Sequence, residues 1–456
     1  MVTWLPIVLL TGVALLWLWL NVSPTMRNNA SQRLEPAEAP TAPLDHWPHV
    51  VIVAPGRNEA SFITTTLPQL CEQDYPNYHV VYIDDHSDDS TPAITAQMTA
   101  RYPHLFVLRN EIEPPLGWVG KCWAVKRGYE EWKRHEAKRE EPSSEFRVPS
   151  SEFKTTESSH APSPFSSSST RNSELGTRNF PSDQNSQLGT RNFESDLICL
   201  TDADINWHPQ CLRTAVTTML HEKADVVSLF PGMVFGSTVE RVLMGTLTFA
   251  LLVMFPISRA MDPNHPDTLT AGAFILTRRK LYDSIGGHEA VKNLVVEDVN
   301  LGRKLKAAGG KVWIAFTQKL ISCRMYEGWS DIWEGLTKNA YAGMEYKPHW
   351  AAALLTANLF GLTLAPIYLL ASLLWLALAP SAFSLTAVGL SAAVLLLQAR
   401  VMNSIRKTFN LPARYAWSLP LGAALYFVIA IASIYRYYRG GNVWKGRSYG
   451  KETSGA

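Results

Sequence analysis

Long apolar stretches lie towards both ends of the chain, and the segment between them alternates short apolar runs with polar segments. Residues 2–20 carry no charge, and about 20 apolar residues suffice to cross the ~30 Å hydrocarbon core of a bilayer. Three further runs of spanning length follow at 350–380, 381–399 and 416–435. The pattern predicts an amino-terminal transmembrane anchor over 1–22, a water-exposed domain over 45–345 and carboxyl-terminal transmembrane helices over 350–436.

Basic residues indicate which side of the membrane each segment faces. A cleaved signal peptide would have a basic start, whereas the first charge here is Arg27, beyond the apolar run. An uncleaved anchor is therefore favoured, and Arg27 and Arg33 place the following domain in the cytosol. The tail 437–456 and the loop 400–414 are both basic, and both cannot be cytosolic if 416–435 is one full span. Either that segment is re-entrant or the tail is translocated despite its charge.

Within 45–345, the apolar runs predict strands of an α/β fold. Runs at 49–54, 79–83 and 197–200 each end in polar or acidic turn residues, and 61–73 reads as a helix between the first two. Strands that alternate with helices favour βαβ units and a parallel sheet. In such sheets, ligands bind beyond the carboxyl ends of the strands. The candidate site is therefore expected at that edge.

Two segments interrupt this plan. Residues 138–196 are rich in serine and contain internal copies, with Ser-Ser-Glu-Phe at 143–146 and 150–153. They are expected to form a disordered, low-complexity insert in a surface loop. Residues 238–262 contain apolar side chains at helical spacing. They fit either a core helix on the sheet or an interfacial helix that dips ~5–10 Å into the leaflet and admits a lipid.

Composition adds limits to this picture. Charged residues are 18% of the chain and hydrophobic residues 46%, as in a membrane protein with a large water-soluble part. The net charge of +2 gives no basic field for nucleic acid. The five cysteines are scattered without zinc-ligand spacing, so buried, reduced thiols are expected.

Two acidic clusters could support chemistry. Asp202 and Asp204 follow the third predicted strand, and two carboxylates two residues apart in a turn can hold one hard divalent cation. Glu297 and Asp298 precede an amphipathic segment, where acids commonly favour a helix amino terminus. If Glu297 and Asp298 are functional instead, they are expected to supply a general base that deprotonates a hydroxyl nucleophile.

These residues resemble the ordered signatures of family 2 glycosyltransferases with the GT-A fold. The signatures are Pro55-x-x-Asn58-Glu59, the run Asp84-Asp85-His86-Ser87-Asp88-Asp89-Ser90-Thr91, Asp202-Ala203-Asp204 and Glu297-Asp298. Further motifs resemble the ceramide-glucosyltransferase-like branch, closest to the bacterial hopanoid-biosynthesis-associated glycosyltransferases: Gly117-Trp118-Val119-Gly120-Lys121-x-Trp123-Ala124, Ala271-Gly272-Ala273-Phe274 and Cys323-Arg324-Met325-Tyr326. The resemblance covers nearly the whole chain outside the insert.

The resemblance implies a role for each matching residue. Asp298 would be the catalytic base with Glu297 beside it, and Asp204 would bind Mg²⁺ or Mn²⁺ together with Asp202. The residues expected to bind the nucleotide sugar are Pro55, Asn58, Glu59, Asp84, Asp85, Lys121 and Asp202. Candidates on the acceptor side are Gly272, Ala273, Phe274, Trp333 and Lys338. The Gln-x-x-Arg-Trp motif of processive synthases is absent from 329–339, which favours a single transfer.

The resemblance thus implies an inverting enzyme of the bacterial inner membrane, with its GT-A domain in the cytoplasm. It would move a hexose from a UDP-sugar to a lipid hydroxyl of a hopanoid- or ceramide-like acceptor. The alternative is a catalytically inactive lipid-binding or lipid-transport protein of the same fold. Such a protein would be expected to lose its acidic ligands, and every acidic signature is present here.

Overall fold

The computed structural model describes residues 4–23, 33–36, 47–140, 196–294, 296–439, 442–444 and 447–449. The chain divides into two compact units, one formed by Met1–Trp132 with Phe193–Ala456 and the other by Lys133–Asn192. Only 133–140 of the second unit is described, so most of the predicted insert 138–196 lies outside the described residues. The sheet and the apolar helices all belong to the first unit.

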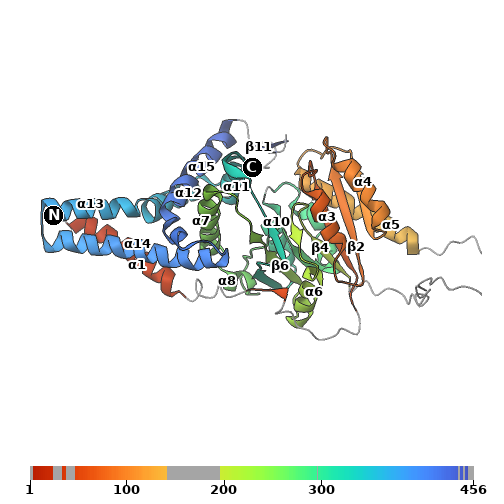
Figure 1. Cartoon of the computed structure of the whole chain (residues 1–456), viewed down its shortest axis with the longest axis horizontal. Coiled ribbons are helices and arrows are strands. Elements are labelled where there is room, and N and C mark those ends of the chain that lie inside the picture. Colours follow the sequence, from red (N-terminus) through yellow and green to blue (C-terminus); the bar gives the residue numbers. More distant parts are fainter. Residues whose placement is uncertain are drawn as a thin grey trace, which may run out of the picture. The chain divides into compact units, whose positions relative to one another are not determined.

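A seven-stranded sheet forms the centre of the α/β part (Figure 1). Its order is β3-β2-β1-β4-β8-β6-β9. The strands are β1 (Val50–Gly56), β2 (Tyr78–Asp85), β3 (Leu105–Asn110), β4 (Leu197–Leu200), β6 (Val226–Phe230), β8 (Ile275–Arg278) and β9 (Val312–Phe316). The three strands expected from the apolar runs are thus β1, β2 and β4, which lie side by side in the middle of the sheet.

The side chains of β1 explain why its sequence is an unbroken apolar run. Successive side chains of a strand point to opposite faces of the sheet. Val50, Ile52 and Ala54 pack in the core on one face, and Val51 and Val53 pack in the core on the other. Because helices cover both faces, both sets must be apolar. The predicted α/β class is confirmed.

One strand departs from the expected parallel arrangement. β8 pairs antiparallel with both β4 and β6, whereas β1 pairs parallel with β2 and β4, and β6 pairs parallel with β9. The reason is the segment between β6 and β8, which forms helices at the edge of the sheet where β6 ends. The chain then enters β8 from that same edge, so β8 runs back and the sheet is mixed.

Helices cover both faces of the sheet, and small sheets flank it. The covering helices are α3 (Ile63–Cys71), α4 (Thr91–Arg101), α5 (Gly120–Glu140), α6 (Cys211–His221), α9 (Arg279–Ser284), the 3₁₀ helix η3 (Gly287–Val291) and α10 (Glu297–Ala307). A three-stranded sheet consists of β5 (Asn206–Trp207), β10 (Ile321–Cys323) and β7 (Gly232–Met233), and β11 (Asn442–Trp444) pairs with β12 (Arg447–Tyr449). All five cysteines are buried and free, as expected.

The region 238–262 forms α7 (Thr238–Met254) and α8 (Ile257–Met261), separated at Phe255 and Pro256. Most of α7 is buried between α14, α15 and α11, and its exposed large apolar residues are Val253 and Met254 at the carboxyl end. The predicted interfacial helix remains a prediction, and only this end of α7 offers apolar surface to a lipid.

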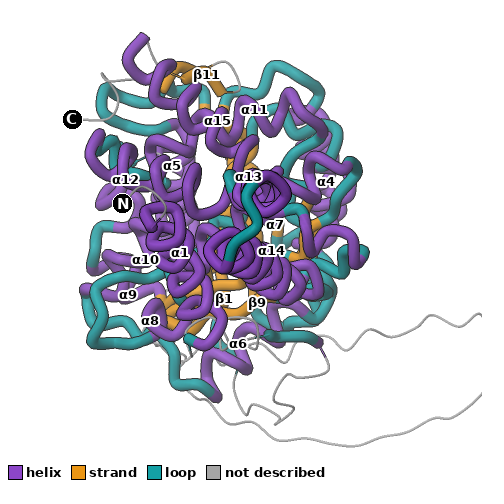
Figure 2. The backbone as a smooth tube through the Cα atoms, turned by 90° about the vertical axis from the view of Figure 1, so that its left-hand side faces the viewer, coloured by secondary structure: helices purple, strands orange, loops and turns teal. Residues whose placement is uncertain are grey.

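The remaining helices are apolar except α11, which also carries Asp331, Glu334 and Lys338. They are α1 (Trp4–Val22), α11 (Gly328–Gly343), α12 (Pro348–Asn358), the π-helical turn η4 (Leu359–Thr363), α13 (Ala365–Leu378), α14 (Ala382–Thr408), the 3₁₀ helix η5 (Ala413–Trp417) and α15 (Leu419–Arg439). Among the described residues, α1, α14 and α15 are each long and apolar enough to cross a membrane. The segment α12–η4 with α13 is a candidate fourth span, bent by 51°. Figure 2 looks along α1, α13 and α14, which pack together as a bundle.

The bend between α12 and α13 lies next to Pro366. Pro366 lacks an amide hydrogen and its ring crowds the carbonyl four residues earlier, which disrupts the preceding turn. The carbonyl of Gly361 in that turn accepts hydrogen bonds from Trp17 Nε1 and Gln398 Nε2, both at 3.0 Å. Neighbouring helices therefore satisfy a carbonyl that the irregular turn leaves exposed to an apolar environment.

The buried carboxylate of Glu240 joins the start of α7 to the start of α11. It accepts hydrogen bonds from the amides of Gly236 (2.6 Å) and Gly328 (3.1 Å), from Ser237 Oγ (2.9 Å) and from Arg324 (3.1 Å). Burial alone would raise the pKa of Glu240, but the bonds from Arg324, Gly236 and Ser237 outweigh it and lower the pKa to about 2. This cluster fixes both helix starts.

Glu240→Gln is expected to lower the free energy of unfolding by about 1.5–3 kcal/mol at pH 7, because a charged acceptor of four hydrogen bonds is replaced by a neutral one. The pKa of Glu240 is depressed in the folded state, so its contribution is present above about pH 4.5 and is lost as pH falls towards 2. Thermal unfolding in detergent measures the effect. The exposed Glu334→Gln is the matched control, and equal melting temperatures for the two variants would contradict the expectation.

Candidate active site

The candidate site residues meet at the carboxyl edge of the central strands. Asp84 and Asp85 end β2, and Asp202 and Asp204 follow β4. Glu297 and Asp298 open α10, and Lys121 is the second residue of α5. Residues 271–274 reach the same edge because β8 runs antiparallel. Five segments far apart in sequence therefore converge where the topology predicts a ligand.

The ammonium group of Lys121 lies between two carboxylates. Its Nζ is 2.5 Å from Asp202 Oδ1 and 2.8 Å from Glu297 Oε1. Burial alone would lower the pKa of Lys121, but the carboxylates of Asp202, Glu297 and Asp298 hold it well above its usual value. Lys121 therefore stays charged in the site.

The two acids of the second cluster have opposite pKa shifts. Burial alone would raise the pKa of Glu297, but Lys121 lowers it. Burial and the neighbouring Glu297 carboxylate raise the pKa of Asp298 to about 6. The amides of Gly272 and Val299 donate to the Asp298 carboxylate at 2.9 and 2.8 Å and fix its orientation. A carboxyl group with this pKa is a base at neutral pH that can also be protonated.

Gly272 sits at the centre of this group. A Cβ added there would lie 3.1 Å from Lys121 Nζ, 3.3 Å from Asp202 Oδ2 and 3.5 Å from Asp298 Oδ2. The absence of a side chain thus allows the backbone amide to approach Asp298 while the three charged groups stay close. Of its neighbours, Ala273 accepts a hydrogen bond from Thr201 Oγ1 at 2.8 Å, and Phe274 is a core residue 5.1 Å from the Trp207 ring.

The two remaining acceptor-side candidates lie on α11 and differ in environment. Burial lowers the pKa of Lys338, and the carboxylates of Glu297 and Asp202 oppose that shift, so Lys338 belongs to the charged cluster. Trp333 instead contacts α15, where the Arg436 guanidinium lies 5.9 Å from its ring centroid. The structure brings Lys338, but not Trp333, to the carboxylates.

The nucleotide-side candidates form two linked loops. The Asn58 amide donates to Ser87 Oγ at 2.9 Å, and the Asp88 amide donates to Asn58 Oδ1 at 3.0 Å. The Glu59 amide donates to Thr91 Oγ1 at 2.9 Å. Asn58 has a φ of 56°, in the left-handed region that asparagine tolerates better than most residues. The loop after β1 is thereby fixed to the loop after β2.

Asp84 and Asp85 are both buried at the end of β2. Burial raises the pKa of Asp84, and Asp85 accepts a hydrogen bond from Asn110 Nδ2 at 2.9 Å. Pro55 of β1 pairs in register with Ile83 and lines a cavity of about 20 Å³ beside Lys121 and Asp298. This cavity has room for about one water molecule and not for a nucleotide sugar.

One residue of the site has no local signal in the sequence. His288, in η3, lines the same cavity, and its Nδ1 is 2.6 Å from the hydroxyl of buried Tyr282. Burial and the nearby Lys121 lower the pKa of His288 to about 3, so the imidazole is neutral. A lone histidine in a turn after two glycines could not be assigned to the site without the fold.

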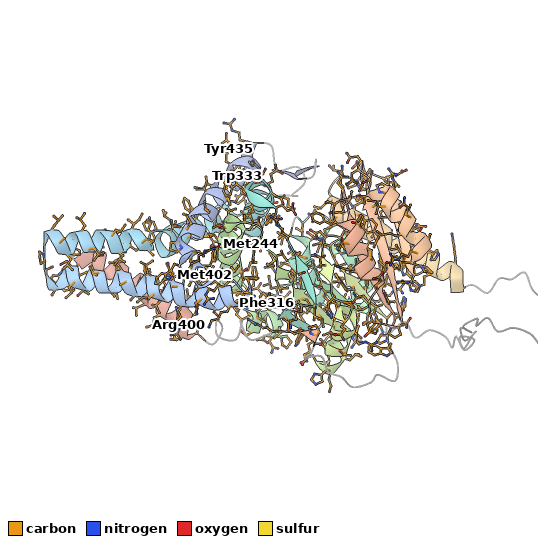
Figure 3. All side chains as sticks on the ribbon, in the orientation of Figure 1. Met244, Phe316, Trp333, Arg400, Met402 and Tyr435 are labelled. Carbon is orange, nitrogen blue, oxygen red and sulfur yellow. The ribbon has the colours of Figure 1, made fainter. Side chains whose placement is uncertain are left out.

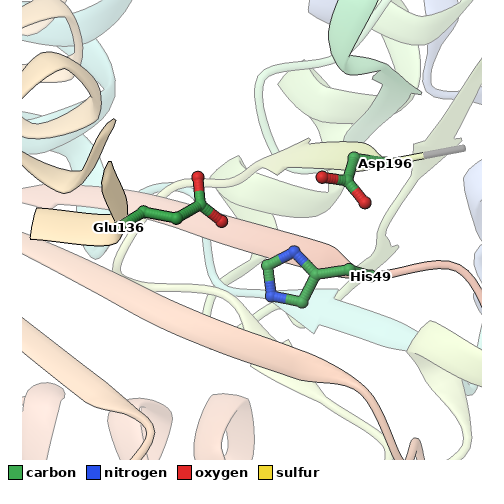
Figure 4. A group of neighbouring side chains, drawn as sticks. All are labelled: His49, Glu136 and Asp196. Atoms are coloured by element: carbon green, nitrogen blue, oxygen red, sulfur yellow. The ribbon is translucent and has the colours of Figure 1, made fainter. Parts of the chain in front are cut away.

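The opposite edge of the sheet also has polar residues. Figure 4 shows His49 and Asp196, which immediately precede β1 and β4. The Leu197 amide donates to the His49 carbonyl at 2.8 Å, and Asp196 pairs with Arg279 at 3.5 Å. These residues precede the strands, whereas the candidate active site follows them.

The donor set at the site fits a hard divalent cation. Carboxylate oxygens are the preferred ligands of Mg²⁺ and Mn²⁺. The ammonium of Lys121 already lies between Asp202 and Glu297, which shows that the local charge favours a cation there. Asp204 is two residues from Asp202 and partly exposed, so it could add a further carboxylate.

Two glycosyltransferase family models match the sequence of this chain. The sequence model of glycosyl transferase family 2 matches residues 51–133, and that of glycosyl transferase family 21 matches 184–453. The β-monoglucosyldiacylglycerol synthases of Synechocystis sp. and Nostoc sp. are each 39% identical to this chain over 75 residues, 16% of the chain. The match spans only 15% and 16% of the length of those relatives.

Two solved glycosyltransferase structures resemble the chain at low identity. The mannosyltransferase PcManGT from Pyrobaculum calidifontis, in complex with GDP-Man and Mn²⁺, is 16% identical with a TM-score of 0.45 and covers 93% of this chain and 99% of its own. S. aureus TarS in complex with UDP-GlcNAc is 14% identical with a TM-score of 0.35 and covers 88% and 95%.

The family assignment follows from the longer of the two matches. Residues 184–453 are more than half of the chain, and they include Asp202, Asp204, Gly272 and Glu297-Asp298. The family 2 match contains Pro55, Asn58, Glu59, Asp84, Asp85 and Lys121. The α/β GT-A fold flanked by apolar helices, which the resemblance implied, is confirmed. The chain belongs to glycosyl transferase family 21 and is a glycosyltransferase.

Proposed function

We propose that this glycosyltransferase moves a hexose from a UDP-sugar to a lipid hydroxyl in one inverting step, at the cytosolic face of a bacterial inner membrane. The observation that supports this most is the cluster of Lys121, Asp202, Glu297 and Asp298 at the carboxyl edge of the sheet. The acceptor is of hopanoid or ceramide type. The relation to diacylglycerol glucosyltransferases supports a lipid.

In the proposed step, Asp298 accepts the proton of the acceptor hydroxyl as its oxygen attacks the anomeric carbon. The bond from that carbon to the diphosphate breaks, and UDP leaves. One carboxylate base suffices for a single displacement. The bonds from the Gly272 and Val299 amides hold Asp298 in one orientation, which contributes to the alignment of base and nucleophile.

Lys121 and Lys338 would stabilise negative charge on the diphosphate as it leaves. A Mg²⁺ or Mn²⁺ ion held by Asp202 and Asp204 would add Lewis-acid stabilisation of the same charge. Lys121 Nζ contacts Asp202 in this structure, so donor binding would involve exchange of that contact for phosphate oxygens. Asp84, Asp85, Asn58 and Glu59 would bind the nucleoside from the two linked loops.

The test is a screen of UDP- and GDP-sugars with the purified full-length chain in nanodiscs, supplied with a bacterial lipid extract. Mass spectrometry is expected to find a hexosylated lipid with a UDP-sugar and about 10³-fold less of it with the Asp298→Asn variant. Transfer only from GDP-sugars would overturn the proposed donor. Donor hydrolysis with no lipid product would overturn the proposed acceptor class.

The pH dependence provides a second check on the base. Asp298 must be deprotonated to act, and its pKa is about 6. Turnover is therefore expected to fall about tenfold for each pH unit below 6 and to reach a plateau above about pH 7. Initial rates between pH 4.5 and 8 at saturating donor would measure this. A flat profile across pH 5–6 would contradict the assignment.

A further inference from the structure

α15 meets the length and composition criteria for a membrane span, and its packing points to a different position. Its 21 residues would reach about 31 Å, the thickness of the hydrocarbon core. A single span here would place the basic loop 400–414 and the basic tail on opposite sides of the membrane. The contacts of the helix decide between crossing the bilayer and lying along it.

Along its length α15 packs on α7 and α11, which adjoin the catalytic part, and it also contacts α12 and η4. Near its start, Gly422 lies directly against Thr246 of α7. In its middle, Ile429 packs with Leu243 of α7 and Leu336 of α11. Near its end, the Ser433 hydroxyl donates to the carbonyl of Thr337 and accepts from the amide of Tyr341 at 3.0 Å.

If α15 crossed the membrane, α11 would have to cross with it. α11 carries Asp331, Glu334 and Lys338 within one helix, and Lys338 belongs to the active-site charge cluster. Charged groups at the centre of a bilayer are costly. The catalytic carboxylates would be drawn into the hydrocarbon as well. The packing of α15 on α11 therefore argues against a crossing position for α15.

The bundle of α1, α13 and α14 has the opposite character. α1, α13 and the first eighteen residues of α14 carry no charge, and their exposed side chains are mostly large and apolar. α14 packs along both α1 and α13. In Figure 1, α15 crosses the direction of this bundle beside α11 and α7. Met402, near the carboxyl end of α14, lies directly against Gly245 of α7. Figure 3 shows Met402 close to Met244 of α7.

The outer face of α15 exposes large apolar side chains, of which Tyr438 also shares a hydrogen bond with the Tyr341 hydroxyl at 3.3 Å and Tyr435 lies 5.4 Å from the Arg439 guanidinium. Five large side chains on this face, here called the α15 stripe, are between 47% and 59% exposed: Leu421, Val428, Ile431, Tyr435 and Tyr438. Exposure of so many large apolar groups along one helix face marks a surface that contacts something other than water. Arg436 and Arg439 lie at the end of the helix, and Arg406, Lys407 and Arg414 precede its start.

We propose that α15 does not cross the membrane but lies along it on the catalytic side, with the α15 stripe immersed in the acyl chains of the adjacent leaflet. The ring of Tyr435 would lie at the same shallow depth as Leu421 and Val428, next to the headgroups, where amphipathic aromatic rings are favoured. Arg414 before the start of α15 and Arg439 at its end would meet anionic headgroups, whereas Arg436 donates to Thr337 Oγ1 of α11 at 3.1 Å. The basic residues of 400–414 and of the tail then lie on one side, and the spans are α1, α14 and the bent segment that contains α13.

The position of α15 in the membrane does not depend on the proposed function and can be tested without an enzyme assay. Single cysteines are introduced in the full-length chain at Ala379, between α13 and α14, at Ala413 before α15, and at Ala456. The native cysteines are buried, so their background labelling should be low. In sealed vesicles, a membrane-impermeant maleimide is expected to label Ala413→Cys and Ala456→Cys from the same side and Ala379→Cys from the other. Labelling of Ala456→Cys from the side of Ala379→Cys would overturn the proposal.

Depth measurements give an independent readout. Nitroxides at Leu421, Val428 and Tyr435, spaced seven residues apart on the stripe, are expected to show equal and shallow depths by power-saturation EPR. A span would place Val428 about 10 Å deeper than the other two, and that result would overturn the proposal. Nitroxides at Leu385 and Gly389 of α14 are the control, and their depths are expected to differ by about 6 Å. Both control positions are exposed, and a side chain at Gly389 meets no atom within 4 Å.

Discussion

Asp298→Asn is expected to lower kcat by about 10³-fold while the KM for the donor stays within about twofold. Asparagine has nearly the same shape, but its single oxygen can accept from only one of the Gly272 and Val299 amides, which donate to different oxygens of Asp298. It cannot take the proton of the acceptor hydroxyl, and general-base catalysis contributes about 10²–10⁴-fold. Steady-state kinetics with a lipid acceptor, on protein of matched expression and melting temperature, measure the effect.

The control for this variant is Asp262→Asn, which changes an exposed aspartate outside the cluster. Its kcat is expected to equal that of the unaltered protein. Full turnover by Asp298→Asn would exclude Asp298 as the base. A large rise in donor KM with little change in kcat would instead assign Asp298 to donor binding.

Lys121→Met is expected to lower kcat by about 10²–10³-fold, the effect of removing one group that stabilises developing charge. The variant also removes a positive charge that lowers the pKa of Asp298. The acidic limb of the pH–rate profile is therefore expected to move to higher pH. A purely structural role would lower kcat without moving that limb.

Lys121→Arg is the conservative partner of this variant. It keeps the positive charge between Asp202 and Glu297, so the acidic limb should stay near pH 6 even if kcat falls. An upward shift of the limb in Lys121→Arg equal to that in Lys121→Met would contradict the electrostatic explanation. The two variants therefore distinguish the effect of the positive charge at position 121 from the effect of the shape of the side chain.

The sequence was sufficient to predict those parts of the fold that depend on local pattern. The apolar runs before Pro55, Asp84 and Asp202 became β1, β2 and β4, because a strand buried on both faces must be apolar throughout. Since parallel strands end at one edge, the convergence of their acidic turns followed from the same pattern. The α1 helix was equally predictable, because its apolar run carries no charge.

Other features depend on contacts between distant segments. The direction of β8 follows from where the chain returns after α7 and α8, and no residue of β8 signals it. His288 reaches the site only because η3 packs beside α10. Lys338 and Trp333 are five residues apart on α11, yet one faces the carboxylates and the other faces α15. The composition of α15 suggests a membrane span, whereas its packing on α11 is the basis of our proposal that it lies along the membrane.

The central claim is a single displacement in which Asp298 activates a lipid hydroxyl. The most direct test is the anomeric configuration of the glycolipid formed by the reconstituted full-length chain from an α-linked UDP-hexose, read from the anomeric proton coupling by NMR. The account predicts a β-linked sugar. An α-linked product would mean retention and would contradict the mechanism.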